Sequence, residues 1–346
     1  MNLITMKKPK EAEPKTFGDW AYLAVKKHFK HTIKYETNVL KDIDPESLHQ
    51  MRVGMRRLRT AINGFAPALS LSKAAKEQKV GKIARQLGEL RDLDVLQDSL
   101  QNQYLPSLPT KEQDTLKKVL SSLGKQRKKT LEQVQTTLKG QQYHKLKVAF
   151  QDWLEEPNYG ELAEISIYEI LPDLLLPSVS NLFLHPAWIV GVKLNDGKIE
   201  VLNDLDSDQV VKLLNTHGDT VHSLRKQAKG VRYQMELFTD FYDSTYKDYL
   251  KDIKEIQSLL GEIQDSFVLA EFLTDNLDSD LTVQLPTLAT ELTETRYQVW
   301  KKWQSFQQRY LNAENRKDFH QAILQPVLKE EKVAPEADEQ STVKNN

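Results

Sequence analysis

The sequence predicts an all-α protein with an internal duplication. Long segments with a helical hydrophobic period dominate the chain, and a cationic helical segment occurs twice at a fixed offset. Between the two copies lies one short stretch with the pattern of a β-hairpin. We therefore expect each half of the chain to form a four-helix bundle, with a small hairpin in the connector.

Length and composition set the first limits on function. With 346 residues, 39% apolar and 28% charged, the chain can bury a sizeable core and is expected to form about two domains. A formal charge of −1 disfavours a protein that coats nucleic acid non-specifically. Any positive potential that matters for binding must therefore come from a local cluster of basic residues. The absence of cysteine excludes disulfides, thiolate nucleophiles and cysteine-ligated metals, and it fits a reducing compartment.

The chain is expected to be cytoplasmic and to make no membrane contact. We find no apolar run long enough to cross a bilayer. The N-terminal residues MNLITMKKPKEAEPK also lack the apolar stretch of a secretory signal.

Each half of the chain supplies about four long helices with short connections, which is typical of a bundle. Asp44 followed by Pro45 indicates an N-cap with proline at the first helical position. The segments with helical period are 17–40, 45–69, 72–103, 111–138 and 142–155 in the first half, then 219–243, 245–276, 284–312 and 316–328 in the second.

The stretch between the two halves has a different pattern. Pro172, Pro177 and Pro186 interrupt it, and Asn195-Asp196-Gly197 separates two short apolar runs as a hairpin turn does. The segment DLDSD at 204–208 then indicates a turn that caps a helix. The expected organisation is a flexible N-terminus over 1–16, a first bundle over 17–160, a connector over 161–205, a second bundle over 206–328 and a disordered tail over 329–346.

The segment HQMRVGMRRLRTAINGF at 49–65 places a purely cationic stripe on one face of a helix. His49, Arg52, Arg56 and Arg59 fall within about 80° of one another at 3.6 residues per turn. The opposite face is apolar. No Asp or Glu inside the segment relieves the repulsion among the arginines, so the compensation must come from elsewhere.

A second stretch, HSLRKQAKGVRYQMELF at 222–238, repeats this design at one constant offset along the chain. His222, Arg225, Lys229 and Arg232 stand at the positions of the first stripe. At the same offset LGELRDLDVL at 87–96 matches LGEIQDSFVL at 260–269 in six of ten positions. Two motifs in one register indicate a duplication and predict that both stripes face a shared groove.

Arginine and lysine side chains are suited to phosphate oxygens, so a polyanion in this groove would neutralise the repulsion. A solvated basic face is the alternative for each stripe. Such faces normally alternate in sign, and this disfavours the alternative for a stripe that is duplicated and free of acidic residues.

The pattern H-x-x-R-x-x-x-[RK]-x-x-[RK], found twice and followed each time by L-G-E-[LI]-x-D, resembles the CHAD family, the conserved-histidine α-helical domains that bind inorganic polyphosphate. The resemblance covers about residues 17–328. It implies two four-helix bundles related by a pseudo-twofold axis, with a basic channel that holds the phosphate chain between them. The polyphosphate-binding positions that carry over are His49, Arg52, Arg56, Arg59, His222, Arg225, Lys229 and Arg232, with Arg57 and Lys226 as flanking candidates.

Further residues near the stripes have more than one reading. The two histidines either contact phosphate or have a structural role. For the matching acidic pairs Glu89/Glu262 and Asp92/Asp265 we favour hydrogen bonding to the basic residues over acid–base chemistry, with Gly88/Gly261 permitting close helix approach. Weaker candidates for the groove are Lys82, Arg85, Arg127 and Arg296.

The leading functional hypothesis is non-enzymatic binding of inorganic polyphosphate, with polyphosphate granules and their proteins as further partners. A nucleic-acid-binding protein is the alternative, although no helix-turn-helix, RRM or zinc signature is found. An enzyme is a third class, but the sequence has neither a P-loop nor a credible acidic metal cluster. We therefore expect no catalysis, no cofactor and no bound metal.

Overall fold

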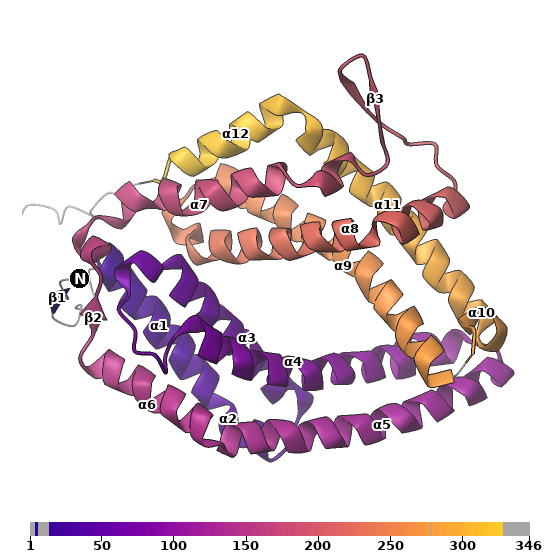
Figure 1. Ribbon diagram of the computed structural model, residues 1–346, viewed down its shortest axis with the longest axis horizontal. Coiled ribbons are helices and arrows are strands. Elements are labelled where there is room, and N and C mark those ends of the chain that lie inside the picture. Colours follow the sequence, from indigo (N-terminus) through magenta and orange to yellow (C-terminus); the bar gives the residue numbers. More distant parts are fainter. Residues whose placement is uncertain (1–3, 6–13, 278, 328–346) are drawn as a thin grey trace, which may run out of the picture.

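The chain is predominantly helical with short antiparallel strand pairs, which confirms the all-α class (Figure 1). The computed structural model describes residues 4–5, 14–277 and 279–327. Most of the N-terminus over 1–16 and all of the tail over 329–346 lie outside these residues, so the expected disorder there stays a prediction.

The described residues of the first half form six α-helices: α1 (Phe17–Lys34), α2 (Glu36–Leu40), α3 (Pro45–Gly64), α4 (Glu77–Asp98), α5 (Thr110–Lys139) and α6 (Gln141–Glu155). Asp44 caps α3 as predicted, because its side chain accepts a 2.7 Å hydrogen bond from the backbone of Ser47 and Pro45 follows at the first position. A short strand pair, β1 (Ile4–Thr5) with β2 (Asn158–Tyr159), ties the N-terminal residues to the end of this half.

The second half begins with α7 (Ile167–Phe183) and a hairpin of β3 (Val192–Asn195) and β4 (Lys198–Val201). The hairpin is confirmed at the predicted place: Asp196 and Gly197 form its turn with φ of 49° and 75°. It projects away from the helices (Figure 1). The remaining helices are α8 (Ser207–Leu237), α9 (Ser244–Leu277), α10 (Leu281–Gln284), α11 (Pro286–Leu311) and α12 (Ala313–Leu324).

Two sequence-based expectations are wrong in this region. Pro172 and Pro177 lie inside α7 instead of breaking it, because α7 buries an apolar residue at every turn and this burial outweighs the lost backbone hydrogen bonds. Helix α8 starts at Ser207 and not near residue 219, since Val210 and Leu214 extend its buried face. The predicted capping turn is confirmed, with Asp206 accepting a hydrogen bond from the backbone of Gln209.

One stretch, Ile167–Ile189, is long and apolar enough to span a membrane by length and composition. The expectation that no such run exists is therefore wrong. In this fold α7 packs on α8 and α12, and 39% of the apolar window is buried; a single helix of this kind is weak evidence for a membrane span. The prediction of no membrane contact stays untested.

The two halves meet at two separate places. One contiguous apolar core runs through helices of both halves, and in it the rings of Phe65 and Phe238 lie 5.3 Å apart between centroids. A second cluster joins α4 and α5 to α9, α10 and α11. There Glu112 accepts hydrogen bonds from the Thr287 hydroxyl at 2.6 Å and from the Thr287 backbone amide at 3.2 Å, at the start of α11. Helices α3 and α8 belong to the first contact.

The buried face of the cationic helices can be tested by truncation. Leu58 and Phe238 are fully buried, so Leu58→Ala or Phe238→Ala should each lower the free energy of unfolding by about 2–5 kcal/mol. Chemical denaturation measures this change. The control Leu184→Ala removes a side chain that is 79% exposed and should stay within about 0.5 kcal/mol of the parent. Parent-like stability of both core variants would contradict the assignment of this face.

Candidate functional site

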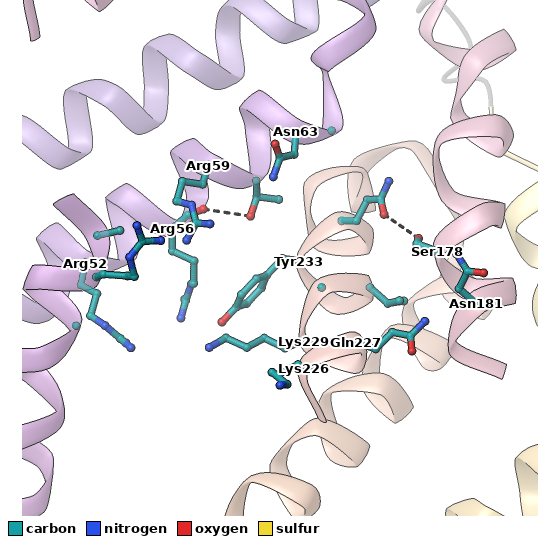
Figure 2. Close-up of a pocket in the computed structure, with 18 of the residues that line it drawn as sticks. Arg52, Arg56, Arg59, Asn63, Ser178, Asn181, Lys226, Gln227, Lys229 and Tyr233 are labelled. Carbon is teal, nitrogen blue, oxygen red and sulfur yellow. Dashed lines mark hydrogen bonds between the residues drawn. The ribbon is translucent and has the colours of Figure 1, made fainter. Parts of the chain in front are cut away.

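A groove of about 900 Å³ lies between α3, α4, α7 and α8. In Figure 2 the labelled side chains of α3 and α8 point toward the same space, with Ser178 and Asn181 of α7 at one side. The predicted site residues that line it are Arg52, Arg56, Arg59, Arg85, Lys226 and Lys229. The structure therefore brings together cations from both sequence motifs.

The amphipathic pattern of α3 and α8 determines where these cations lie. Met51, Met55 and Leu58 of α3 are fully buried, and so are Leu224 and Ala228 of α8. Because these residues fix one face of each helix in the core, the opposite face turns toward the groove. The orientation of the stripes follows from the apolar period of the same two segments.

Carboxylates from other positions offset the repulsion within each stripe. Arg52 lies 3.6 Å from Asp92 of α4, and Arg225 lies 3.6 Å from Asp265 of α9. Both aspartates therefore form ion pairs with the stripes, but the distances are too long for the expected hydrogen bonds. The end of each stripe is neutralised differently. The Nε of Arg59 donates to Glu77 at 2.6 Å, whereas Arg232 lies 3.7 Å from Glu236.

The matching acids Glu89 and Glu262 do not share this role. Glu89 lines the groove and accepts a 3.3 Å hydrogen bond from Gln86, one turn away on α4. Glu262 instead lines a separate hollow beside α11. Within the described part of the chain, neither carboxylate forms an ion pair with the stripes.

The matching glycines make room for arginine side chains. A Cβ at Gly88 would lie 3.6 Å from the Nε of Arg52, and a Cβ at Gly261 would lie 3.2 Å from the Nε of Arg225. We expected these glycines to permit close approach of helix backbones. The nearest groups at each are guanidinium atoms, so the glycines leave space for the arginine side chains instead.

Arg56 and Lys229 occupy equivalent positions and differ from the other cations. Within the described residues, neither has a carboxylate within 4.0 Å. Burial lowers the pKa of Lys229, and the charges of Arg225, Arg52 and Arg56 lower it further. Cations from both halves thus crowd one site and repel one another.

An aromatic ring lies among these cations. The guanidinium groups of Arg56 and Arg232 each lie 4.6 Å from the ring centroid of Tyr233. Burial lowers the pKa of Arg56; the nearby tyrosine opposes this shift, and the charge of Arg232 adds to it. The ring face attracts both guanidinium groups and so stabilises a close pair of like charges.

The two histidines do not line the groove. Burial lowers the pKa of His49, with the charge of Arg91 as the next cause, and burial followed by Lys226 and Arg225 lowers the pKa of His222. Both shifts favour the neutral imidazole over the charged form. The two histidines are therefore weaker contributors of positive charge than the arginines and lysines of the stripes.

Four predicted candidates lie elsewhere and are not part of the proposed site. Arg57 is exposed on α3, and its charge contributes to lowering the pKa of His28 on α1, after burial and the charge of Lys27. Lys82 is exposed on α4 outside the groove lining. The period of a helix places a residue on a face, but it does not say which neighbour covers that face.

The other two candidates are held in the scaffold. Arg127 donates to Asp94 at 2.6 Å and to both carboxylate oxygens of Asp42 at 2.9 Å. Arg296 is buried, donates from Nε to the Ser266 hydroxyl at 2.6 Å, and lies 4.3 Å from the ring centroid of Phe267. The spacing between Arg127 and Arg296 departs from the constant offset of the stripes, and this broken register was the signal that they are not equivalent.

Sequence reasoning missed several residues of the site. Tyr233 directly follows Arg232 in the motif, so its position beside a cation was the available signal. Arg91 of the LGELRD motif lies near His49 but outside the groove lining, and the second copy has Gln264 at its position. Ser178 and Asn181 of α7 gave no signal, because the connector was expected to be broken by proline.

The fold and groove together define an all-helical protein whose two halves contribute cations to one groove. The CHAD domain family model matches residues 23–274, and the chain belongs to this family. No curated protein matches the chain.

Two solved structures share this fold. The crystal structure of the CHAD domain from the plant Ricinus communis has a TM-score of 0.57 and 20% identity, covering 92% of this chain and 96% of that one. PptA from Streptomyces chartreusis has a TM-score of 0.59 and 13% identity, covering 86% and 100%. At these identities the likeness concerns the fold.

The scaffold role of Arg127 predicts an acid-sensitive contribution to stability. Its hydrogen bonds hold the pKa of Asp42 below the usual range, so this stabilisation is present above the unfolded pKa of about 3.9 and is lost as the pH falls through the folded value. Arg127→Met should lower the free energy of unfolding by about 3 kcal/mol at pH 7, because it leaves the buried Asp94 unpaired.

Denaturation at pH 7 and at pH 3.5 measures this difference, which should shrink at the lower pH. Lys125→Met removes an exposed cation from the same helix and serves as the control. A stability loss that is equal at both pH values would contradict the assignment.

Proposed function

We propose that this protein binds inorganic polyphosphate, without chemical turnover, in the groove between α3 and α8. The observation that carries the proposal is the pair Arg56 and Lys229: two cations at equivalent positions, on one groove, without a carboxylate partner among the described residues. Phosphate oxygens match both side chains. A chain of phosphates can contact cations of both halves at once.

Family membership supports the same ligand. The CHAD domain family is linked to polyphosphate binding in general. The groove lining offers guanidinium, ammonium, amide and hydroxyl groups, which bind and orient an anion. We therefore propose a binding protein of the cytoplasm that associates with polyphosphate granules and their proteins.

The paired site is best explained by a pseudo-twofold relation between the halves. Phe65 contacts Phe238, and a Cβ at Gly64 would lie 2.6 Å from Leu237. Each contact joins positions that the repeat offset makes equivalent, and contacts between equivalent positions are what a twofold axis produces. We propose duplicated bundles over 17–160 and 206–328, joined by a connector over 161–205.

Nucleic acid is the alternative ligand, since its phosphates would meet the same cations. Binding of single strands commonly adds stacking of bases on aromatic rings. Tyr233 is the aromatic residue of the described groove lining, and Arg56 and Arg232 already lie against its ring. This arrangement favours polyphosphate.

Removal of the cations tests the site. Arg52→Ala, Arg56→Ala, Arg225→Ala and Lys229→Ala should each weaken polyphosphate binding about tenfold, because each removes a charge-assisted contact. The combined variant should lose binding and stay folded, since the side chains lie opposite the buried face and alanine favours helix. Calorimetric titration and thermal melting of the same samples measure both effects.

Lys82→Ala provides the matched control, because it removes an exposed cation of α4 outside the groove. Its affinity should equal that of the parent protein. Full-affinity binding by the quadruple variant would show that the groove is not the site.

Binding should also depend strongly on salt and chain length. Each phosphate contact displaces condensed counterions, so the logarithm of the affinity should fall linearly with the logarithm of the salt concentration. Orthophosphate should bind far more weakly than the polymer, since it reaches few cations. Titration across salt concentrations, with single-stranded DNA and RNA at matched salt, gives the measurement. Salt-independent affinity, or tighter binding of nucleic acid, would overturn the proposal.

A further inference from the structure

Two aspartates at equivalent positions lie beside arginines of the two cationic stripes. Asp92 of α4 and Asp265 of α9 are equivalent positions of the two repeats. Each carboxylate keeps 73% of its side-chain surface exposed, and each lies 3.6 Å from a terminal guanidinium nitrogen, of Arg52 and Arg225 respectively. Both halves thus place a negative charge at the same position beside a proposed ligand contact.

The two carboxylates act on the same group of charges. Asp92 lines the groove, and Asp265 lies beside Arg225 outside the groove lining. Partial desolvation by the surrounding protein raises the pKa of Asp265; Asp92 adds to this rise, while Arg225, Lys229 and His222 oppose it. The charge of Asp92 also opposes the lowering of the pKa of Lys229 that burial and the neighbouring arginines cause. An anion that bridges Arg52, Lys229 and Arg225 therefore passes close to both aspartates.

The ion pairs are loose. A separation of 3.6 Å is too long for a hydrogen bond, so neither aspartate saturates its guanidinium group. Among the described residues the buried Nε of Arg225 also has no acceptor. Phosphate can offer two parallel oxygens to a guanidinium fork at hydrogen-bond distance. Phosphate therefore competes well for Arg52 and Arg225, and the carboxylates oppose it.

We propose that Asp92 and Asp265 are internal competitors of the phosphate ligand, which neutralise Arg52 and Arg225 in the free protein and limit the affinity of the groove. This inference rests on the proposed function. It concerns how the site is regulated: the carboxylates stabilise the empty groove and weaken the occupied one. The opposite role, orientation of the arginines toward the ligand, predicts the opposite sign on removal.

The test replaces both carboxylates by the isosteric amide. Asp92→Asn with Asp265→Asn should bind long-chain polyphosphate at least about tenfold more tightly at low salt, because two like charges leave the vicinity of the ligand. The slope of the logarithm of affinity against the logarithm of salt concentration should become steeper by up to about two. The reason is that both arginines then attract salt anions, which the ligand must displace. The ligand-free variant should melt at a lower temperature, and polyphosphate should restore much of the loss.

A matched control removes the same charge from the same helices. Asp98→Asn with Asp275→Asn changes exposed aspartates about 9 and 15 Å further along α4 and α9. This variant should gain less than threefold in affinity. Each single substitution at Asp92 or Asp265 should give part of the full gain, which keeps the test informative if the double variant folds poorly.

The outcomes separate the two proposals. Weaker binding by the double variant, or a gain no larger than that of the control, would overturn the competitor role and leave polyphosphate binding in place. Failure of the parent protein to bind polyphosphate would overturn the proposed function, and this inference with it.

Discussion

Contact between Phe65 and Phe238 holds two cationic helices together against the repulsion of their own charges. The rings are buried at the seam of α3 and α8, and their packing fixes which faces of these helices turn to the groove. Hydrophobic burial is largely insensitive to salt, whereas repulsion across a solvated groove is screened. The apolar contact can therefore maintain the charged surface on one side of the seam.

Other elements of the site moderate this repulsion without removing it. Aspartates from α4 and α9 lie near the outer arginines at 3.6 Å, and Tyr233 lies against two guanidinium groups. Among the described residues, Arg56 and Lys229 have no carboxylate within 4.0 Å. Nearby carboxylates reduce the repulsion among the outer arginines, whereas the central cations have no such close partner. The protein can therefore fold and still keep a cationic groove.

The apolar period and the constant offset predicted the helical class, the buried faces of α3 and α8, and the presence of cations from both motifs on one groove. Contacts between distant segments could not be predicted in this way. Arg127 and Arg57 lie on helix faces whose neighbours depend on tertiary packing. Helix α7 could not be predicted in this way, because Pro172 and Pro177 locally disfavour a helix. The burial of its apolar side chains, which opposes that effect, depends on the tertiary structure.

The cap of α11 has a consequence for the order in which the chain folds. Glu112, which accepts the hydrogen bonds of Thr287, precedes it by 175 residues. The N-terminus of α11 therefore lacks this acceptor until α5 is in place. During synthesis α5 emerges first, so the acceptor Glu112 is already present when α11 forms. A circular permutant that begins near α8 would reverse this order of synthesis. Helix α11 would then leave the ribosome before Glu112, and its first backbone amides would lack this hydrogen-bond acceptor.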